Sequence, residues 1–358
     1  MLVHKHLTHS MMKFSRAPFY GLAIISGLLI SACQPTETIS VVSGKTMGTT
    51  YQVSIVHAPS ETLESIHLEI DKELININNL MSTYDNESEI SRFNRAEINR
   101  GFALSPETFQ VVQFSLLVAR LTNGAFDPTV GPLVDLWGFG PPGGRQIIPD
   151  EVAIKSAKSK VGFQSLILTS EPATLTARQP RHLDLSAVAK GFAVDQIGAL
   201  LQDAGYQSFL VEIGGELLAK GSKPGGLPWR VAVELPDSRL RSILRTLPLI
   251  DQAIATSGDY RNYFEYEARR FSHTLDPRTG NPVTHKLTSV TVLADTAMKA
   301  DGWATGLAVL GPVDGLELAD QLGIAALMLV RGKDNLTLVE SQAFKDYLNR
   351  VNSEPGAP

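Results

Sequence analysis

Several short segments of the chain alternate apolar and polar residues, which is the pattern of half-buried β-strands. TYQVSIV, at 50–56, is one example. QSFLVEIGGELLAKG, at 207–221, carries two such runs around a Gly pair, which indicates two strands joined by a turn. We predict strands or strand pairs at 50–56, 164–178, 207–221, 229–235, 289–295 and 325–331.

Other segments repeat apolar residues at the three- and four-residue spacing of a helix. SPET, at 105–108, combines a Ser suited to the N-cap with Pro in the first helical position, so a helix is expected over 105–122. Ser60 is the expected N-cap of a helix over 60–80. Further helices are predicted at 187–204, 296–311, 316–323 and 340–350.

Strands and helices are mixed along the chain without a regular βαβ alternation. This order favours an α+β fold or an irregular α/β sandwich, with mixed sheets and packed helices, over a doubly wound sheet. We expect one domain over 44–350, preceded by a polar tether at 33–43 and followed by a flexible tail at 351–358.

The predicted helix TAMKADGWATGLAVLG, at 296–311, contains an acid among small and apolar residues. Asp301 and Thr305 are four residues apart, so they share one face of this helix. A carboxylate in such a segment is costly unless it is paired or binds a metal ion. The spacing allows a shared metal ion or a buried hydrogen bond between the two side chains.

The first 32 residues are expected to be targeting information rather than part of the fold. Lys5, Lys13 and Arg16 precede an apolar run at 17–32. Its 16 residues are fewer than the roughly 20 that a membrane-spanning helix needs. A basic start followed by a short apolar run is typical of a secretory signal.

This apolar run ends in ISAC, at 30–33, which resembles a bacterial lipobox. In a lipobox, cleavage precedes a cysteine that is then acylated. Cys33 is the single cysteine of the chain, so no internal disulfide can form. We expect an exported, periplasm-facing lipoprotein anchored in a membrane, and Gln34 favours the outer over the inner membrane by analogy with known lipoproteins. The alternative is an ordinary signal peptide with a chance cysteine.

Removal of residues 1–32 would make the chain more acidic. It takes away three of the 32 basic residues and none of the 37 acidic ones, so the formal charge falls from −5 to −8. A protein this acidic has no general footprint for nucleic acid. The sequence also contains no P-loop, no G-x-G-x-x-G after a strand, no HExxH, no Cys/His metal spacing and no G-x-S-x-G.

Five clusters carry candidate chemistry. Taken alone, four of them could be structural: a tight turn, a solvated loop, a core helix or a structural histidine. The apolar, aromatic loop at 124–140 resembles a pocket wall. The clusters are GKTMGT at 44–49, LMSTYDNESEISRFN at 80–94, GAFDPTVGPLVDLWGFG at 124–140, HLDLSAVAKGFAVDQIG at 182–198 and FSHTLDPRTGNPV at 271–283.

Specific residues in these clusters suggest a binding site. Tyr84 lies in a polar loop, where an aromatic ring can stack on a planar ligand. Asp127 lies in an apolar, aromatic loop and would be costly there unless bonded. Asp184 and Lys190 flank a helix start, which offers free N–H groups and a positive charge to an anion. His273 is the histidine beside a turn rich in charged and hydroxyl groups.

In this order, the clusters resemble the FAD:protein FMN transferase family, also called ApbE-type lipoproteins. The resemblance runs from KTMGT at 45–49 to ADGWAT at 300–305, and includes GAFDPTVGPLVDLWGFG, DLSAVAKGFAVD, VEIGGE and HTLDPRTG. It implies an ApbE-like fold, FAD as substrate and Mg²⁺ as the essential ion. It also implies that the FMN moiety of FAD is transferred to a Thr or Ser hydroxyl of an acceptor protein, with release of AMP. The acceptors implied are flavin-carrying subunits of membrane redox complexes.

The resemblance also implies roles for individual residues. The metal ligands implied are the backbone carbonyl of Ala187, Asp301 and Thr305. Contacts with FAD are implied for Met47, Tyr84, Ala125, Phe126, Asp127, Asp184, Lys190 and His273.

Elementary chemistry agrees with this assignment. Mg²⁺ prefers oxygen ligands, few of them from protein. The metal on Asp301, together with Lys190, would neutralise charge on the pyrophosphate. His273 is the expected general base for the acceptor hydroxyl, because an imidazole can take a proton near neutral pH. The alternatives are an FAD pyrophosphatase that uses water at the same site, a flavin-binding redox lipoprotein and a non-catalytic periplasmic binding lipoprotein.

Overall fold

A computed structural model describes residues 37–140, 148–235, 242–258, 263–266, 269–333 and 335–353. The expected signal peptide, Cys33 and Gln34 lie outside the described residues. Within the described ranges, no helix has both the length and the apolar character needed to cross a bilayer.

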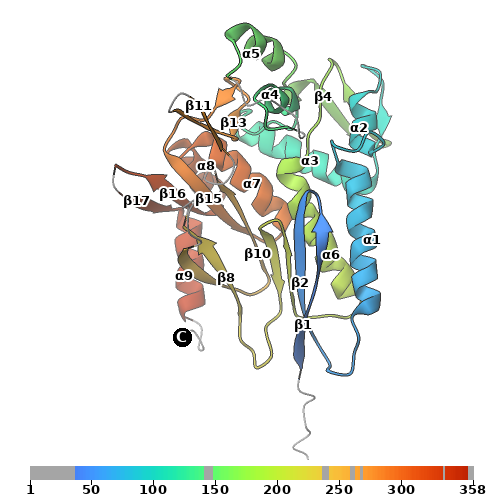
Figure 1. Cartoon of the computed structure of the whole chain (residues 1–358), viewed down its shortest axis with the longest axis vertical. Helices are drawn as coiled ribbons and strands as arrows, with labels where there is room; N and C mark the ends of the chain where they lie inside the picture. Colours follow the sequence, from blue (N-terminus) through green and yellow to red (C-terminus); the bar gives the residue numbers. More distant parts are fainter. Residues whose placement is uncertain are drawn as a thin grey trace, which may run out of the picture. The chain divides into compact units, whose positions relative to one another are not determined.

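An antiparallel sheet of eight strands forms the centre of the fold (Figure 1). Its strand order is β1-β2-β6-β7-β10-β15-β16-β17, and each neighbouring pair runs antiparallel. The strands are β1 (Thr38–Thr46), β2 (Thr49–His57), β6 (Phe209–Ile213), β7 (Glu216–Lys220), β10 (Gln252–Gly258), β15 (Leu287–Ala294), β16 (Ala325–Arg331) and β17 (Leu336–Glu340).

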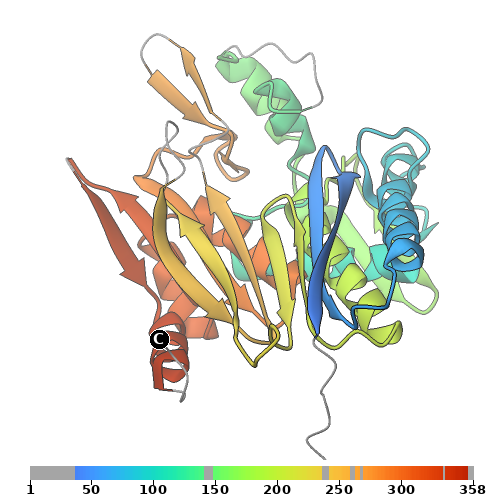
Figure 2. The same cartoon turned by 60° about the horizontal axis from the view of Figure 1, so that its bottom comes forward.

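Helices α1, α3, α6 and α7 cover one face of this sheet (Figure 2), whereas α9 lies on the opposite face. Helices α6 and α7 lie against each other and against the central strands, while α1 packs on α6 and α3 packs on both. The helices are α1 (Glu64–Met81), α2 (Glu89–Asn94), α3 (Pro106–Leu121), α4 (Gly131–Leu136), α5 (Glu151–Lys158), α6 (Ser186–Asp203), α7 (Ala297–Leu310), α8 (Asp314–Leu322) and α9 (Gln342–Ser353), with a short 3-10 turn at Phe163–Ser165.

The central strands are buried on both faces. On β16, Ala326 and Met328 belong to the core shared with the helices. The intervening Leu327 and Leu329 belong to a second core on the opposite face, which includes Phe344 of α9. Side chains alternate between the two faces of a strand, and both faces of β16 meet an apolar core. Its sequence is therefore a continuous apolar run.

Four small sheets complete the described fold. The hairpin of β8 (Trp229–Glu234) and β9 (Ile243–Leu249) supplies the second core with apolar side chains. The three-stranded sheet β3-β5-β4 consists of β3 (Phe102–Ala103), β4 (Leu166–Ser170) and β5 (Ala173–Ala177). The other two are β11 (Tyr263–Tyr266) with β12 (Arg269–Ser272), and β13 (Leu275–Asp276) with β14 (Asn281–Pro282).

The observed architecture confirms the predicted α+β sandwich with packed helices, and each predicted element is present. The Ser105 cap is also observed, since its side chain accepts a hydrogen bond from the Thr108 N–H. The predicted cap at Ser60 is wrong: α1 begins at Glu64, with Leu63 as its N-cap. The buried series of this helix starts only at Ile66, so tertiary packing supports no earlier turn.

The predicted ends of the domain also differ from the structure. Strand β1 starts at Thr38 and pairs along its length with β2, so residues 38–43 belong to the sheet rather than to a tether. Helix α9 extends to Ser353, beyond the predicted start of the tail. Residues 354–358 lie outside the described part of the chain.

Candidate functional site

A large cavity opens between the ends of α6 and α7, the β6–β7 turn and the loop at 124–140. Its volume is about 1030 Å³, which is at the upper end of the about 300–1,000 Å³ of small-molecule sites. Polar groups converge in it from distant parts of the chain. Of the residues proposed from the sequence, those that line it are Tyr84, Ala125, Phe126, Asp127, Asp184, Ala187, Lys190, His273, Asp301 and Thr305.

Three charged side chains meet on the cavity wall. The Lys190 ammonium lies 3.8 Å from Asp301 Oδ2 and 3.5 Å from Glu216 Oε1. Both carboxylates are buried, at 3% exposure for Asp301 and 5% for Glu216. The acid in the apolar helix α7 is therefore paired, which offsets part of the cost of its burial.

These three groups shift one another's protonation. Burial raises the pKa of Asp301, although the Lys190 ammonium and the Gly191 N–H oppose that shift. Burial also raises the pKa of Glu216, and the nearby Asp301 adds to the effect. For Lys190, burial acts to lower the pKa, but the attraction of Asp301 and Glu216 outweighs it, so the pKa lies above its ordinary value. Lys190 is thus a fixed positive charge on the wall.

Helix α6 approaches α7 closely at this point because residue 191 is glycine. A Cβ added there would lie 2.2 Å from the Ala297 carbonyl oxygen. At this contact the Gly191 N–H donates to Asp301 Oδ2, at 3.1 Å. The ordinary helical acceptor of that N–H is the Ala187 carbonyl, four residues earlier. Helix geometry therefore directs the Ala187 carbonyl toward the same N–H group that donates to the Asp301 carboxylate.

Thr305 faces the same side of α7 as Asp301. Its Oγ1 lies 3.2 Å from Ser257 Oγ near the end of β10. Among the described residues, no hydrogen bond joins Thr305 to Asp301, so the buried hydrogen bond that the spacing also allowed is not formed. A carboxylate, a hydroxyl and a backbone carbonyl thus converge on one wall. This donor set fits Mg²⁺, which takes hard oxygen ligands and keeps several waters.

The loop containing Asp127 is held by that residue's own carboxylate. Oδ1 accepts hydrogen bonds from the Thr129 N–H at 2.8 Å and the Thr129 hydroxyl at 2.6 Å, and Oδ2 accepts from the Phe163 N–H at 3.0 Å. Burial raises the pKa of Asp127, while these hydrogen bonds and the charge of Arg181 oppose the shift. The sequence-based expectation that this acid must be bonded is therefore confirmed.

The start of α6 also faces the cavity. The Ser186 N–H and hydroxyl both donate to Asp184 Oδ1, at 2.9 Å and 2.5 Å. Asp184 in turn donates its N–H to the Pro128 carbonyl, at 2.7 Å, which ties this turn to the Asp127 loop. The positive end of α6 and the Lys190 ammonium are thus presented to the same space, an arrangement that suits a phosphate group.

His273 lines the cavity from the segment before β13. Its ring lies edge-on to Phe139, with the ring centroids 6.3 Å apart. The following turn is anchored on α4's C-terminal end, because Trp137 Nε1 donates to the Gly280 carbonyl at 2.9 Å. The neighbouring Asp276 and Arg278 pair with each other at 2.8 Å. His273 is the titratable group of this segment that faces the cavity.

Two residues proposed to contact FAD, Tyr84 and Met47, differ in where they lie relative to the cavity. Tyr84 lies at the cavity's rim with 65% of its surface exposed, so its ring is available for stacking. Met47 does not line the cavity. It lies in the β1–β2 turn with a positive φ of 48° and packs against the main core.

Sequence reasoning assigned no role to several polar residues that line the cavity, among them two glutamates, a serine and a histidine. Glu212 and Glu216 flank the Gly pair of the β6–β7 turn, Ser257 ends β10 and His182 precedes Asp184. Glu216 lay within the quoted VEIGGE segment. The VEIGGE segment therefore pointed to Glu216. Its ion pair with Lys190 could not be predicted, because the two residues meet only in the folded chain.

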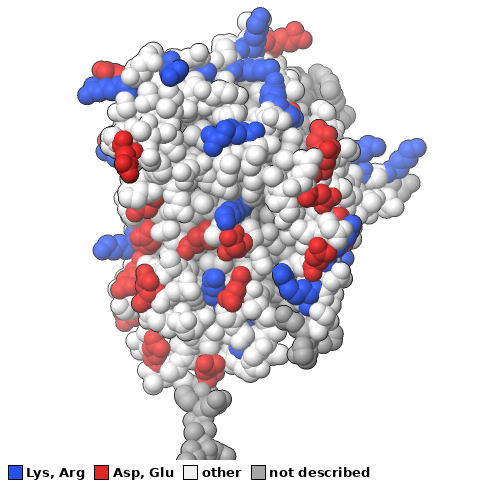
Figure 3. Space-filling view, turned by 180° about the vertical axis from the view of Figure 1, so that it is seen from behind, with Lys and Arg blue, Asp and Glu red and all other residues white. Residues whose placement is uncertain are grey.

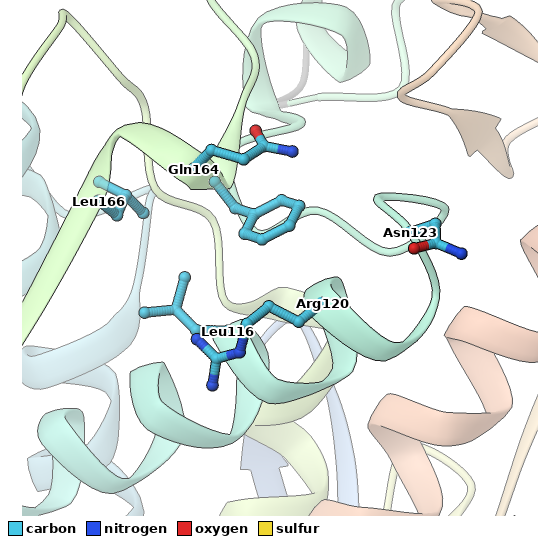
Figure 4. A pocket seen from close by; sticks show the side chains of 6 residues that line it. Leu116, Arg120, Asn123, Gln164 and Leu166 are labelled. Atoms are coloured by element: carbon cyan, nitrogen blue, oxygen red, sulfur yellow. The ribbon is translucent and has the colours of Figure 1, made fainter.

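Figure 4 shows a second, smaller cavity, with side chains of α3 on one side and of the segment at 163–166 on the other. Its volume is about 510 Å³, and it contains none of the residues proposed for catalysis. Arg120 and Asn123 come from the end of α3 and the turn after it, whereas Gln164 and Leu166 come from the segment that opens β4.

Acidic and basic side chains are mixed on the surface of the molecule. Figure 3 shows acidic and basic side chains interspersed across one face. This face therefore offers mixed charge rather than the continuous basic stripe to which a nucleic acid would bind.

Comparisons with known proteins give one consistent result. A family model described as "ApbE family" matches residues 47–328. The FAD:protein FMN transferase of Vibrio cholerae is 42% identical over 335 residues, covering 92% of this chain and 98% of that protein. The corresponding protein of Escherichia coli K12 is 38% identical over 322 residues, covering 88% and 92%.

Solved structures agree. The flavin transferase ApbE from Vibrio cholerae superposes with a TM-score of 0.81 at 40% identity, covering 87% of this chain and 99% of that one. The apo flavinyl transferase ApbE of Pseudomonas stutzeri gives a TM-score of 0.80 at 38% identity, covering 87% and 97%. The chain therefore belongs to the ApbE family.

Proposed function

We propose that this protein is an Mg²⁺-dependent FAD:protein FMN transferase. It moves the FMN moiety of FAD to a Thr or Ser hydroxyl of an acceptor protein and releases AMP. The observation that carries this proposal is the convergence of Lys190, Asp301, Thr305 and the Ala187 carbonyl on one wall of a cavity large enough for a dinucleotide.

The reaction exchanges the phosphoanhydride bond of FAD for a phosphoester bond to the acceptor. The acceptor oxygen forms a bond to the FMN phosphorus, the bond from that phosphorus to the bridging oxygen breaks, and AMP leaves with the bridging oxygen. His273 takes the proton of the acceptor hydroxyl. Bound Mg²⁺ supplies Lewis-acid stabilisation of the pyrophosphate charge.

The protein's own groups position the substrate. The Lys190 ammonium and the N-terminus of α6 bind the negatively charged pyrophosphate. Asp301, Thr305 and the Ala187 carbonyl would hold the cation. Tyr84 stacks on a planar ring of FAD at the rim. Most of the catalytic effect expected of such a site comes from position and charge neutralisation.

Hydrolysis of FAD to FMN and AMP is the second candidate, because water can replace the acceptor hydroxyl in the same geometry. A non-catalytic flavin-binding lipoprotein is disfavoured, since it would give no role to the oxygen ligand set or to His273.

We also propose that the protein is a lipoprotein anchored through Cys33 and facing the periplasm, with flavin-carrying subunits of membrane redox complexes as its acceptors. The proposal rests on the ISAC segment at 30–33 and on Gln34 for the choice of the outer membrane. Mass spectrometry of the N-terminus of wild type and Cys33→Ala tests it: wild type should begin at an acylated Cys33, and the variant should carry no acyl group.

Product analysis with and without an acceptor separates the two enzymatic candidates. The full chain in detergent is incubated with FAD and Mg²⁺, and AMP, FMN and covalent flavin are quantified. Transfer predicts AMP release that depends on the acceptor and free FMN that stays low. Hydrolysis predicts equal amounts of AMP and FMN without acceptor, and no AMP under any condition would contradict both.

A further inference from the structure

Glu216 is a buried carboxylate on the cavity wall to which the proposed mechanism gives no task. The two glycines before it, Gly214 and Gly215, have φ values of 64° and 109°, which place it at the first position of β7 directly after a tight turn. A Cβ at Gly214 would lie 3.3 Å from Lys190 Cδ and 3.5 Å from Glu216 Oε2. The turn is therefore shaped around the contact between these two side chains.

The two oxygens of Glu216 have different surroundings. Oε1 lies 3.5 Å from the Lys190 ammonium. Oε2 is buried without any hydrogen-bond partner among the described residues. Leaving a buried acceptor unpaired costs free energy. The carboxylate that Lys190 contacts through Oε1 thus carries a second acceptor oxygen that no donor in the described part of the chain uses, and an ammonium has three donors.

Lys190 is shared between two carboxylates, since it also lies 3.8 Å from Asp301. A cation held by Asp301 would compete with the ammonium for that carboxylate. Glu216 would then be the remaining anion in contact with Lys190, with Oε2 as a second acceptor. A lysine with a flexible four-carbon stem needs such an anchor if its charge is to stay at one point of the cavity.

We propose that Glu216 is the positioning residue for Lys190: it holds the ammonium in the cavity, where it meets the pyrophosphate of FAD, once Asp301 is engaged by the metal ion. This inference rests on the proposed function, because FAD is the ligand that the held ammonium would meet.

A double-mutant cycle tests whether Glu216 acts through Lys190. FAD binding to the full chain in detergent is measured by flavin fluorescence in Mg²⁺, without acceptor, for wild type, Glu216→Gln, Lys190→Met and the double variant. Glu216→Gln keeps the shape of the side chain and removes its charge. It should weaken FAD binding about 10-fold in the wild-type background, as expected for loss of a charge-assisted contact. It should have less than about a 2-fold effect in the Lys190→Met background, where there is no ammonium left to position.

Glu212→Gln is the matched control. Glu212 lies at the other end of the same turn, where its Oε1 accepts from the Gly215 N–H at 2.8 Å, and it makes no ion pair with Lys190. Its effect on FAD binding should be the same in both backgrounds. Circular dichroism and thermal unfolding establish that each variant is folded. If Glu216→Gln does not fold, Glu216→Asp, which keeps the charge but shortens the reach, is put through the same cycle.

Equal effects of the Glu216 variant in both backgrounds, or none in either, would overturn the inference. These outcomes are distinct from failure of the proposed function. A wild type that binds FAD and flavinylates an acceptor, but whose variants combine additively, refutes only the role of Glu216. A wild type that does not bind FAD in Mg²⁺ refutes both.

Discussion

The backbone N–H of Gly191 donates to Asp301 Oδ2 at 3.1 Å, across the contact between α6 and α7. This one hydrogen bond joins residues that are 110 positions apart in the sequence. It fixes the carboxylate beside the Ala187 carbonyl, so the backbone of one helix and a side chain of another can act as a single oxygen site.

Gly191→Ala should destabilise the protein because the added Cβ would lie 2.2 Å from the Ala297 carbonyl oxygen. Overpacking of this kind costs about 1–3 kcal/mol. Urea unfolding measures the loss. Gly198→Ala on the same helix is the matched control, since its Cβ would meet the end of the Leu218 side chain, which can move. A loss at residue 191 no greater than that at residue 198 would mean that the helix contact tolerates a methyl group.

Ser257→Ala should weaken Mg²⁺ binding about 10-fold, the lower end of the cost of losing a group that orients a metal ligand. The reason is that Ser257 Oγ lies 3.2 Å from Thr305 Oγ1, and either hydroxyl can donate. With a metal ion on the Thr305 oxygen, the Thr305 hydroxyl would donate its hydrogen bond to Ser257. Calorimetry in the presence of FAD measures the affinity. Thr291→Val is the control, because it removes the neighbouring Thr256–Thr291 hydroxyl pair at 2.9 Å without touching Thr305. Equal losses in the two variants would contradict a specific role for Ser257.

Asp195 should make stability depend on pH. Its carboxylate accepts from the N–H groups of Ala297 and Met298 at the start of α7, at 2.7 Å and 2.9 Å. Burial nevertheless raises the pKa of Asp195 to about 6, against the opposing effect of these hydrogen bonds. Between about pH 4 and pH 6 the native state therefore binds more protons than the unfolded state, whose Asp has a pKa of about 3.9, so stability falls as pH rises.

The measurement is the free energy of unfolding of wild type minus that of Asp195→Asn, from pH 4 to pH 8. Asn does not titrate, so the hydrogen bonds lost in the variant change this difference by an amount that does not depend on pH. The difference should fall by at most about 3 kcal/mol up to about pH 6 and then stay level. A difference that rises with pH would mean that the positive end of α7, rather than burial, dominates.

His273→Ala should reduce the rate of FMN transfer by about 10²-fold or more, the usual range for loss of a general base. FAD binding should change much less than the rate, so single-turnover kinetics and fluorescence binding are measured together. His182→Ala is the comparison, since His182 lines the same cavity. Wild-type transfer by His273→Ala with FAD still bound would eliminate His273 as the base.

Sequence periodicity could predict that Asp301 and Thr305 share a face, because that relation depends only on helix geometry. It could not predict the Gly191 contact, the Ser257 partner or the Glu216 ion pair. Each of these joins elements far apart in the chain, and only packing of α6, α7 and the central sheet brings them together. Ala187 was proposed as a metal ligand only from the family resemblance, because an alanine side chain has no group that could bind a metal ion.

The hydrophobic pattern predicted the elements that are buried on one face or that are apolar throughout. It missed β10, whose QAIATSG sequence has small residues and few large apolar ones. That strand is defined by pairing with β7 and β15 on either side, a tertiary effect that overrides weak local preference. The first part of strand β1 was similarly predicted to be a tether, because it carries polar side chains. Its pairing with β2 along the whole strand is a tertiary contact that the pattern does not indicate.

The most direct measurement of the central claim is covalent flavin on an acceptor domain, detected by in-gel fluorescence and mass spectrometry after incubation with the full chain, FAD and Mg²⁺. Wild type should add one FMN phosphoryl group to a single Thr or Ser and release AMP in equal amount. Asp301→Ala should remain folded and lose this activity at every Mg²⁺ concentration. Undiminished acceptor labelling by Asp301→Ala would contradict the account.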